Sequence, residues 1–116
     1  GRQVRDVLHI DDLCQLIFLQ IKKIKKINNL TLSFGGGKAN SINLEQLTQK
    51  IKKYSKCSLK INKINKTSIY DIPYFVGSNK NVFNIYSWKP KKKINEIIAD
   101  VYNWQKNNIK ILKKVL

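Results

Sequence analysis

Tyr102 and Lys106 are the side chains whose spacing most resembles that of an acid–base pair. Residues four apart lie on one face of a helix, where an ammonium group can assist proton transfer by a phenol. Both residues belong to the terminal helical segment of the 116-residue chain, which its apolar periodicity marks as a packing element. Seven scattered carboxylates and one histidine, His9, suggest no other catalytic dyad or triad. The sequence therefore predicts no catalytic residue in this chain.

The run Gly35-Gly36-Gly37 invites comparison with phosphate-binding loops, because it follows a predicted strand and precedes a predicted helix. A dinucleotide fingerprint would need glycine where Asn40 stands, and no acidic ribose partner follows. A Walker loop would need Ser or Thr where Ala39 follows Lys38. We interpret the glycines as structural, permitting positive φ and close approach of another backbone segment.

The two cysteines, Cys14 and Cys57, occur in unrelated contexts, and His9 is the single histidine. Zinc sites need closely spaced cysteine and histidine ligands, so we expect no metal site. Neither a signal peptide nor a run of about 20 apolar residues is present, which favours a reduced, cytoplasmic protein.

The formal net charge of +16 has two explanations. A surface for nucleic acid or an anionic membrane is one. A codon bias, as AT-rich coding produces, is the other. We favour it because 21 of the 23 basic residues are lysine, spread over every segment. In either case the charge favours an anionic ligand in any cleft.

Strands and helices alternate along the chain. We expect a strand within 3–10, a helix from an N-cap at Asp11 or Asp12 to about 27, a strand at 30–34, and a helix after Asn43, with Gln46 completing a capping box. A strand at 59–64, an edge strand within 69–76, a short helix at 79–86 and a final helix at 92–107 complete the set. The order predicts an α/β class whose neighbouring strands are partly parallel.

Three blocks, in this order, resemble the extended short-chain dehydrogenase/reductase family of nucleotide-sugar epimerases and dehydratases. The first is Gln3-Val4-Arg5-Asp6-Val7-Leu8-His9-Ile10-Asp11-Asp12-Leu13. The second is Phe34-Gly35-Gly36-Gly37 with Asn40-Ser41-Ile42-Asn43-Leu44, and it is most similar to the CDP-tyvelose (CDP-paratose) 2-epimerases. The third is Asp71-Ile72-Pro73, then Trp88-Lys89-Pro90, a helix and Trp104.

The resemblance implies a partial Rossmann-type epimerase fold, with C-terminal strands and helices plus a small substrate-binding lobe. Residues 1–116 would form a single substrate-side domain, and the absence of an initiator Met fits a fragment. NAD would be held by the Rossmann part of the parent, which this chain lacks, so we expect no cofactor in this segment. The family's catalytic Tyr-x-x-x-Lys pair also lies upstream of the blocks present here, and we therefore expect the isolated chain to be inactive.

Arg5 is the residue that the resemblance assigns to the diphosphate of a nucleotide-sugar. A guanidinium can bind a diphosphate through two parallel charged hydrogen bonds. The alternative is a surface arginine paired with Asp6 or a helix end. His9, Gly36 and Asn40 are possible residues of the substrate cleft, although a histidine among apolar residues is more often a packed one.

The chain departs from the family where a second arginine usually precedes the position of Asp71. Ser68 and Ile69 stand there, and Lys66 or Tyr70 would have to compensate. Lysine supplies a point charge rather than a fork, so the departure weakens the expectation of tight binding.

The expected partners are a nucleotide-sugar, the missing Rossmann part and a second copy of this chain in a dimer. We expect no membrane and no specific nucleic acid. Two other functions stay open: a small basic nucleic-acid-binding protein, and a ligand-free structural remnant or interaction module.

Overall fold

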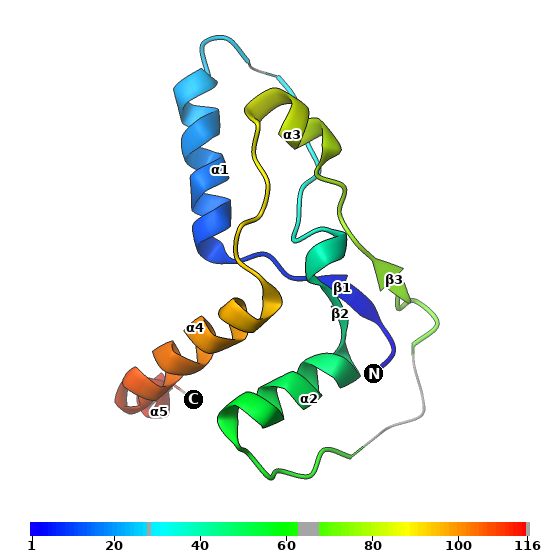
Figure 1. The fold of residues 1–116 in the computed structure, drawn as a ribbon, viewed down its shortest axis with the longest axis vertical. Helices are drawn as coiled ribbons and strands as arrows, with labels where there is room; N and C mark the ends of the chain where they lie inside the picture. The colour runs from blue at the N-terminus through cyan, green and yellow to red at the C-terminus, as the bar shows by residue number, and fades with distance from the viewer. Residues whose placement is uncertain (28, 63–67, 116) are drawn as a thin grey trace.

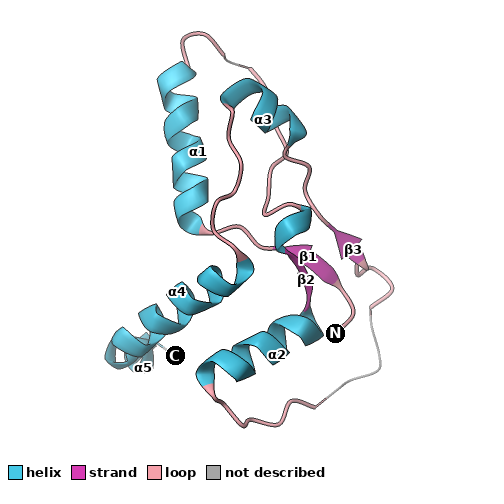
Figure 2. Cartoon of the chain, in the orientation of Figure 1, coloured by secondary structure: helices cyan, strands magenta, loops and turns pink. Residues whose placement is uncertain are grey.

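A mixed α/β chain is seen in the computed structural model, which describes residues 1–27, 29–62 and 68–115 (Figures 1 and 2). The elements in order are β1 (Val4–Asp6), α1 (Ile10–Lys23), a 3₁₀ turn (Lys38–Asn40), β2 (Ser41–Asn43), α2 (Leu44–Ser55), β3 (Tyr74–Phe75), α3 (Lys80–Tyr86), α4 (Ile94–Asn107) and α5 (Ile109–Val115). The predicted α/β class is confirmed at this level.

Strand β1 is the centre of the three-stranded sheet found in the described residues, in the order β2-β1-β3. It pairs antiparallel with β2, so that Arg5 faces Ile42, and parallel with β3, so that Arg5 faces Phe75. The strands are therefore partly parallel, as expected. Both edges of β1 are occupied by segments far from it in sequence.

Helix α1 begins two or three residues earlier than the sequence predicted. His9 is its N-cap, and His9 Nδ1 accepts the backbone N–H of Asp11 at 3.1 Å. The prediction of an Asp11 or Asp12 cap was wrong, because the carboxylate of Asp12 is buried and used by another segment. The helix ends at Lys23 rather than near 27, with Lys22 and Lys23 in its last turn, where cations suit the helix dipole.

The predicted capping box of α2 is present. Asn43 Oδ1 accepts the Gln46 backbone N–H at 2.7 Å, and Gln46 Oε1 accepts the Asn43 backbone N–H at 3.3 Å. The residues just before the helix form β2, which local pattern did not reveal.

Two predicted strands are absent from the described residues. Segment 30–34 has strand-like alternation but no strand, since both edges of β1 are already filled. Residues 59–62 are also not a strand, and residues 63 and 64 lie outside the described ranges. Helix α5 was not predicted, because we expected the helix at 92–107 to be the last one.

The core is small and centres on Trp88, which is 2% exposed. It packs with Leu16 of α1 and with Val82 and Tyr86 of α3, and the Phe34 ring meets it edge-on at 6.2 Å. Phe34 itself is more than one-third exposed. The other end of the chain depends on contacts between α2 and α4, where Ile97 and Ile98 are buried.

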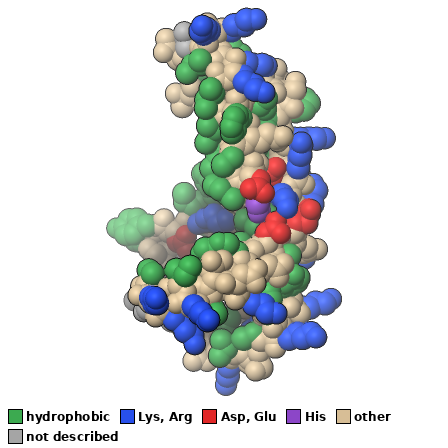
Figure 3. All heavy atoms as spheres, turned by 90° about the vertical axis from the view of Figure 1, so that its left-hand side faces the viewer, with side chains coloured by type: hydrophobic (Ala, Val, Ile, Leu, Met, Phe, Trp, Pro, Cys, Tyr) green, Lys and Arg blue, Asp and Glu red, His purple; other side chains and the backbone are tan. Residues whose placement is uncertain are grey.

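The chain is open for its size. Its radius of gyration is 17.3 Å, whereas about 13 Å is typical of a compact domain of this length. It exposes 9793 Å², whereas a compact monomer of this mass exposes roughly 6,500 Å². Figure 3 shows hydrophobic side chains along the upper part of one face, where α1 lies. Much apolar surface is thus left without cover by this chain.

Within the described residues, no helix combines the length and the apolar character that crossing a membrane requires.

We predict that Leu16→Ala lowers the free energy of unfolding by about 2–5 kcal/mol, because it leaves a cavity beside Trp88 and Val82. Urea denaturation followed by tryptophan fluorescence measures this loss. Gln15→Ala in the same helix is the control, since Gln15 is exposed and its replacement should cost about 1 kcal/mol or less. Equal losses would contradict the assignment of Leu16 to the core.

Candidate functional site

Arg5 lies on the central strand, and its guanidinium is fixed by three hydrogen bonds. Nη1 donates to the backbone carbonyls of Val4 and Ile72, each at 2.8 Å. Nη2 donates to Asp71 Oδ1 at 3.1 Å, in an ion pair whose arginine side chain is 42% exposed. Asp71, not Asp6, is therefore the partner of Arg5.

Asp71 is shared between two residues of the first block. Its second oxygen, Oδ2, accepts a hydrogen bond from Gln3 Nε2 at 2.7 Å. The carboxylate therefore aligns the guanidinium against the segment that leads into β3. Of the five N–H donors of an arginine side chain, the three bonds above use three, and Nε and one N–H of Nη2 have no partner among the described residues.

The glycine turn is held by Asp6, whose side chain points to the opposite side of β1 from that of Arg5. Asp6 Oδ2 accepts the backbone N–H groups of Gly37 at 2.9 Å and Gly77 at 3.2 Å. A side chain at Gly36 would clash with the backbone of Val7, and Gly37 has a φ of 70°. The structural interpretation of the glycines is confirmed.

The amides of this turn have partners within the chain. The Asn79 side chain accepts the Gly35 N–H at 2.9 Å and donates to the Gly35 carbonyl at 3.0 Å. Since Asp6 takes the Gly37 N–H, these two groups are not available to a pyrophosphate. The turn does not fit a dinucleotide.

His9 lies at the start of α1, beside a carboxylate of α4. Its Nε2 is 3.4 Å from Asp100 Oδ2, which also accepts a hydrogen bond from Lys92 Nζ at 2.8 Å. The Lys92 hydrogen bond lowers the pKa of Asp100 below its ordinary value, and the same bond raises the pKa of Lys92. Figure 3 shows acidic side chains gathered in the middle of this face.

Asp12 and Asn40 hold the backbone that carries Lys92. The Asp12 carboxylate, in a residue only 4% exposed, accepts the N–H groups of Lys91 at 3.1 Å and Lys92 at 3.0 Å. Asn40 is 2% exposed and donates to the Lys92 carbonyl at 2.8 Å, while its Oδ1 is buried without a hydrogen-bond partner. The sequence analysis missed this role of Asp12, for which the doubled aspartate at the helix start was the one available signal.

The predicted site residues thus fall into two groups. Arg5 lies with Asp71, and Tyr70, 88% exposed, is adjacent to that carboxylate in the chain. His9 and Asn40 lie around Lys92, and Gly36 packs on Val7. Lys66 lies outside the described residues. Their part in one substrate cleft stays a prediction.

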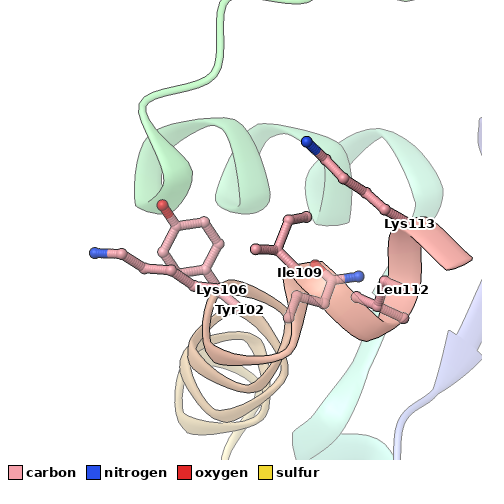
Figure 4. A pocket seen from close by; sticks show the side chains of 6 residues that line it. Tyr102, Lys106, Ile109, Leu112 and Lys113 are labelled. Carbon is pink, nitrogen blue, oxygen red and sulfur yellow. The ribbon is translucent and has the colours of Figure 1, made fainter.

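Tyr102 and Lys106 both lie on α4 and line the cavity of about 680 Å³ drawn in Figure 4. The Tyr102 ring meets that of Tyr54 edge-on at 5.3 Å, which ties α4 to α2. Within the described ranges, no three His, Cys, Asp or Glu side chains come close enough together to hold a metal ion.

Comparison with known proteins gives two relatives, and no family model matches the chain. A CDP-paratose 2-epimerase of Salmonella typhi is 29% identical over 104 residues, which are 90% of this chain and 30% of that enzyme. A UDP-glucuronate 4-epimerase of Thermodesulfobacterium geofontis (strain OPF15) is 26% identical over 117 residues, 99% of this chain and 34% of that enzyme. The chain thus spans about a third of the length of the curated relatives it matches.

These similarities confirm the resemblance drawn from the three blocks. The chain is related to the NAD-dependent sugar epimerases of the short-chain dehydrogenase/reductase family.

We predict that Asp100→Asn removes a pH-dependent part of the stability. Because the folded pKa of Asp100 is lowered, its contribution is present above the unfolded value, about 3.9, and is lost as pH falls through the folded value. The free energy of unfolding of the wild type should therefore fall more than that of Asp100→Asn as acid is added. Urea titrations at a series of pH values measure both.

Glu45→Gln is the control for Asp100→Asn, since it removes an exposed carboxylate at the start of α2. It should leave the acid dependence close to that of the wild type. Parallel curves for wild type and Asp100→Asn would show that the Lys92–Asp100 contact contributes nothing.

Proposed function

We propose that this chain is the substrate-side part of an NAD-dependent nucleotide-sugar epimerase or dehydratase, with a partial Rossmann-type fold, and that it is not catalytic alone. The observation that carries the proposal is the fixed, half-exposed guanidinium of Arg5, in a chain related to nucleotide-sugar epimerases. Its ligand would be the diphosphate of a nucleotide-sugar.

The surroundings of Arg5 support this role. Two carbonyls and one carboxylate hold the guanidinium in place before any ligand arrives, which reduces the entropy lost on binding. The +16 charge of the chain draws an anion towards it. Tyr70, exposed beside Asp71, is the described side chain best placed to substitute for the missing second arginine.

The hydride chemistry would belong to NAD bound by the other two-thirds of the parent enzyme. The glycine turn of this chain does not take part, because its amides bond to Asp6 and Asn79. The contribution of this chain would be to hold the nucleotide and diphosphate, so that the sugar is fixed against the cofactor.

We further propose that the NAD-binding part of the parent covers the open apolar face of α1. That face carries residues at helical spacing: Ile10, Cys14, Ile17, Phe18 and Ile21. Segment 30–34, with its strand-like alternation and no partner strand in the described residues, would add to the parent's sheet. Alone, the chain would cover the α1 face by forming a dimer.

A ligand-free interaction module is the competing function. It is favoured by the internal hydrogen bonds of Arg5, which a purely structural arginine would also make, and by the large apolar surface. Nucleotide binding separates the two proposals.

We predict that UDP and CDP perturb amide NMR signals around Arg5, and that Arg5→Lys weakens binding roughly ten- to a hundredfold. The lysine keeps the charge but loses the two parallel donors that a diphosphate needs. Titrations of the isotopically labelled chain measure both affinities, and the spectrum without ligand reports whether the variant is folded.

Arg2→Lys is the matched control, because Arg2 is exposed and three residues away. It should bind like the wild type. Equal affinity of Arg5→Lys and wild type, or no response to millimolar nucleotide, would favour the ligand-free module.

We predict that the isolated chain dimerises and that Phe18→Gln shifts it towards monomer, because Phe18 is 66% exposed on the α1 face. Size-exclusion chromatography with light scattering over a concentration series measures the shift. Phe83→Gln on α3, where the side chain is 50% exposed, is the control and should leave the dimer intact. A wild-type chain that stays monomeric at every concentration would overturn the dimer.

A further inference from the structure

An apolar trough runs between α2, α4 and α5. One part, of about 370 Å³, lies between α2 and α4, and the other, of about 680 Å³, lies against α5. Tyr102 and Gln105 line both parts, so the two are adjacent. None of the lining residues belongs to the groups around Arg5 and His9, so this surface is separate from the proposed diphosphate site.

The lining of the trough is apolar and accessible. Ile51 and Tyr54 of α2 are each 44% exposed, Val101 of α4 is 51% exposed, and Ile109 of α5 is 49% exposed. Figure 4 shows Tyr102, Ile109 and Leu112 together, with Lys106 and Lys113 extending to different sides of them. The arrangement is an apolar floor with ammonium groups at its rim.

The charged residues that line the trough are basic. Lys106 and Lys113 are the charged side chains in its lining. The same three helices also carry five further lysines, together with Glu45, Glu96 and Asp100, which are outside the lining. The stretches 46–62 and 101–116 contain no aspartate or glutamate. Over the ranges that the structure describes, the ion pairs formed involve Arg5, His9 and Lys92, and Lys50 donates only to the Asn95 amide oxygen. The rim therefore carries two lysines and no acidic residue.

This combination excludes several occupants on physical grounds. A second copy would bring the same positive charge against the rim, which costs free energy. Tyr54 and Tyr102 pack edge-on against each other, so one ring face is already covered and fewer faces remain for stacking on a nucleic-acid base. A bilayer surface accepts a projecting apolar face, whereas this one is concave.

We propose that the trough docks an acidic amphipathic helix of a partner protein. Apolar side chains at positions i, i+3, i+4 and i+7 of that helix would fill the floor between α2 and α5. Carboxylates flanking this stripe would meet the lysines of the rim, which sets the orientation and speeds association.

The test uses the full chain and a fluorescent 18-residue helical peptide, designed at roughly five turns, with a leucine stripe flanked by glutamates. Fluorescence anisotropy should show saturable binding that weakens as salt rises. A peptide of the same composition with its leucines scattered off the stripe should bind at least about fivefold more weakly, since it has no continuous apolar face. A peptide with lysine in place of glutamate should not bind.

Two pairs of variants locate the contact. Ile109→Gln should weaken binding at least about fivefold, whereas Ile111→Gln on the same helix, outside the lining, should not. Lys113→Glu should weaken binding and flatten its salt dependence, whereas Lys25→Glu after α1 should have little effect. Circular dichroism checks that each variant keeps its helix content.

Each other outcome overturns the proposal. Equal binding of the scattered-leucine peptide would mean attraction by charge alone. Binding to anionic vesicles or single-stranded DNA that exceeds binding to the peptide, and does not respond to Ile109→Gln, would assign the basic surface to those ligands. A dimer that Ile109→Gln dissociates would make the occupant a second copy.

Discussion

The buried carboxylate of Asp12 joins the two halves of the chain. It accepts two backbone N–H groups from Lys91 and Lys92, about 80 residues away in sequence, and the Asp12 carbonyl accepts the indole N–H of Trp88 at 3.1 Å. A buried carboxylate is costly unless its oxygens are hydrogen-bonded, and here both are bonded. Trp88 is thereby placed in the core, and Lys92 is placed where it reaches Asp100. The α1–α3 half and the α2–α4 half both depend on this connection.

The side chains of strand β1 alternate between its two sides and hold a different loop on each side. Arg5 points to the segment that leads into β3 and binds Asp71 there, while Asp6 points to the other side and holds Gly37 and Gly77. Three residues of strand thus fix two distant loops. A site on this strand is positioned by the sheet on both edges, which suits a residue that must hold its orientation before a ligand binds.

The open shape of the chain leaves a large accessible surface. The chain exposes roughly 3,000 Å² more than a compact monomer of its mass, an area in the range of permanent interfaces. The apolar α1 face and segment 30–34, which pairs with no strand in the described residues, are adjacent in sequence, so the proposed interface with the parent enzyme would cover both. The trough beside α5 differs, because Lys106 and Lys113 lie in its lining, whereas the lysines of α1 lie in its last turn.

Local signals were sufficient where a few neighbouring residues determine the structure. The capping box of Asn43 and Gln46, the close-packed glycines and the helices at 79–86 and 92–107 follow from interactions within one turn or one loop, and all were predicted. The sequence by itself also determined the relationship to sugar epimerases, since the three blocks occur in order.

Only the tertiary structure decided which segments pair and which charges meet. Segment 30–34 has the pattern of a strand, but β2 and β3 occupy the edges of β1, and a hydrogen-bonding pattern cannot be read from one strand alone. Asp71 rather than Asp6 is the partner of Arg5. His9 rather than Asp12 is the cap of α1, because the buried carboxylate of Asp12 accepts the amides of Lys91 and Lys92. Contacts between residues 66 to 80 positions apart depend on how the whole chain closes, and local sequence carries no record of that closure.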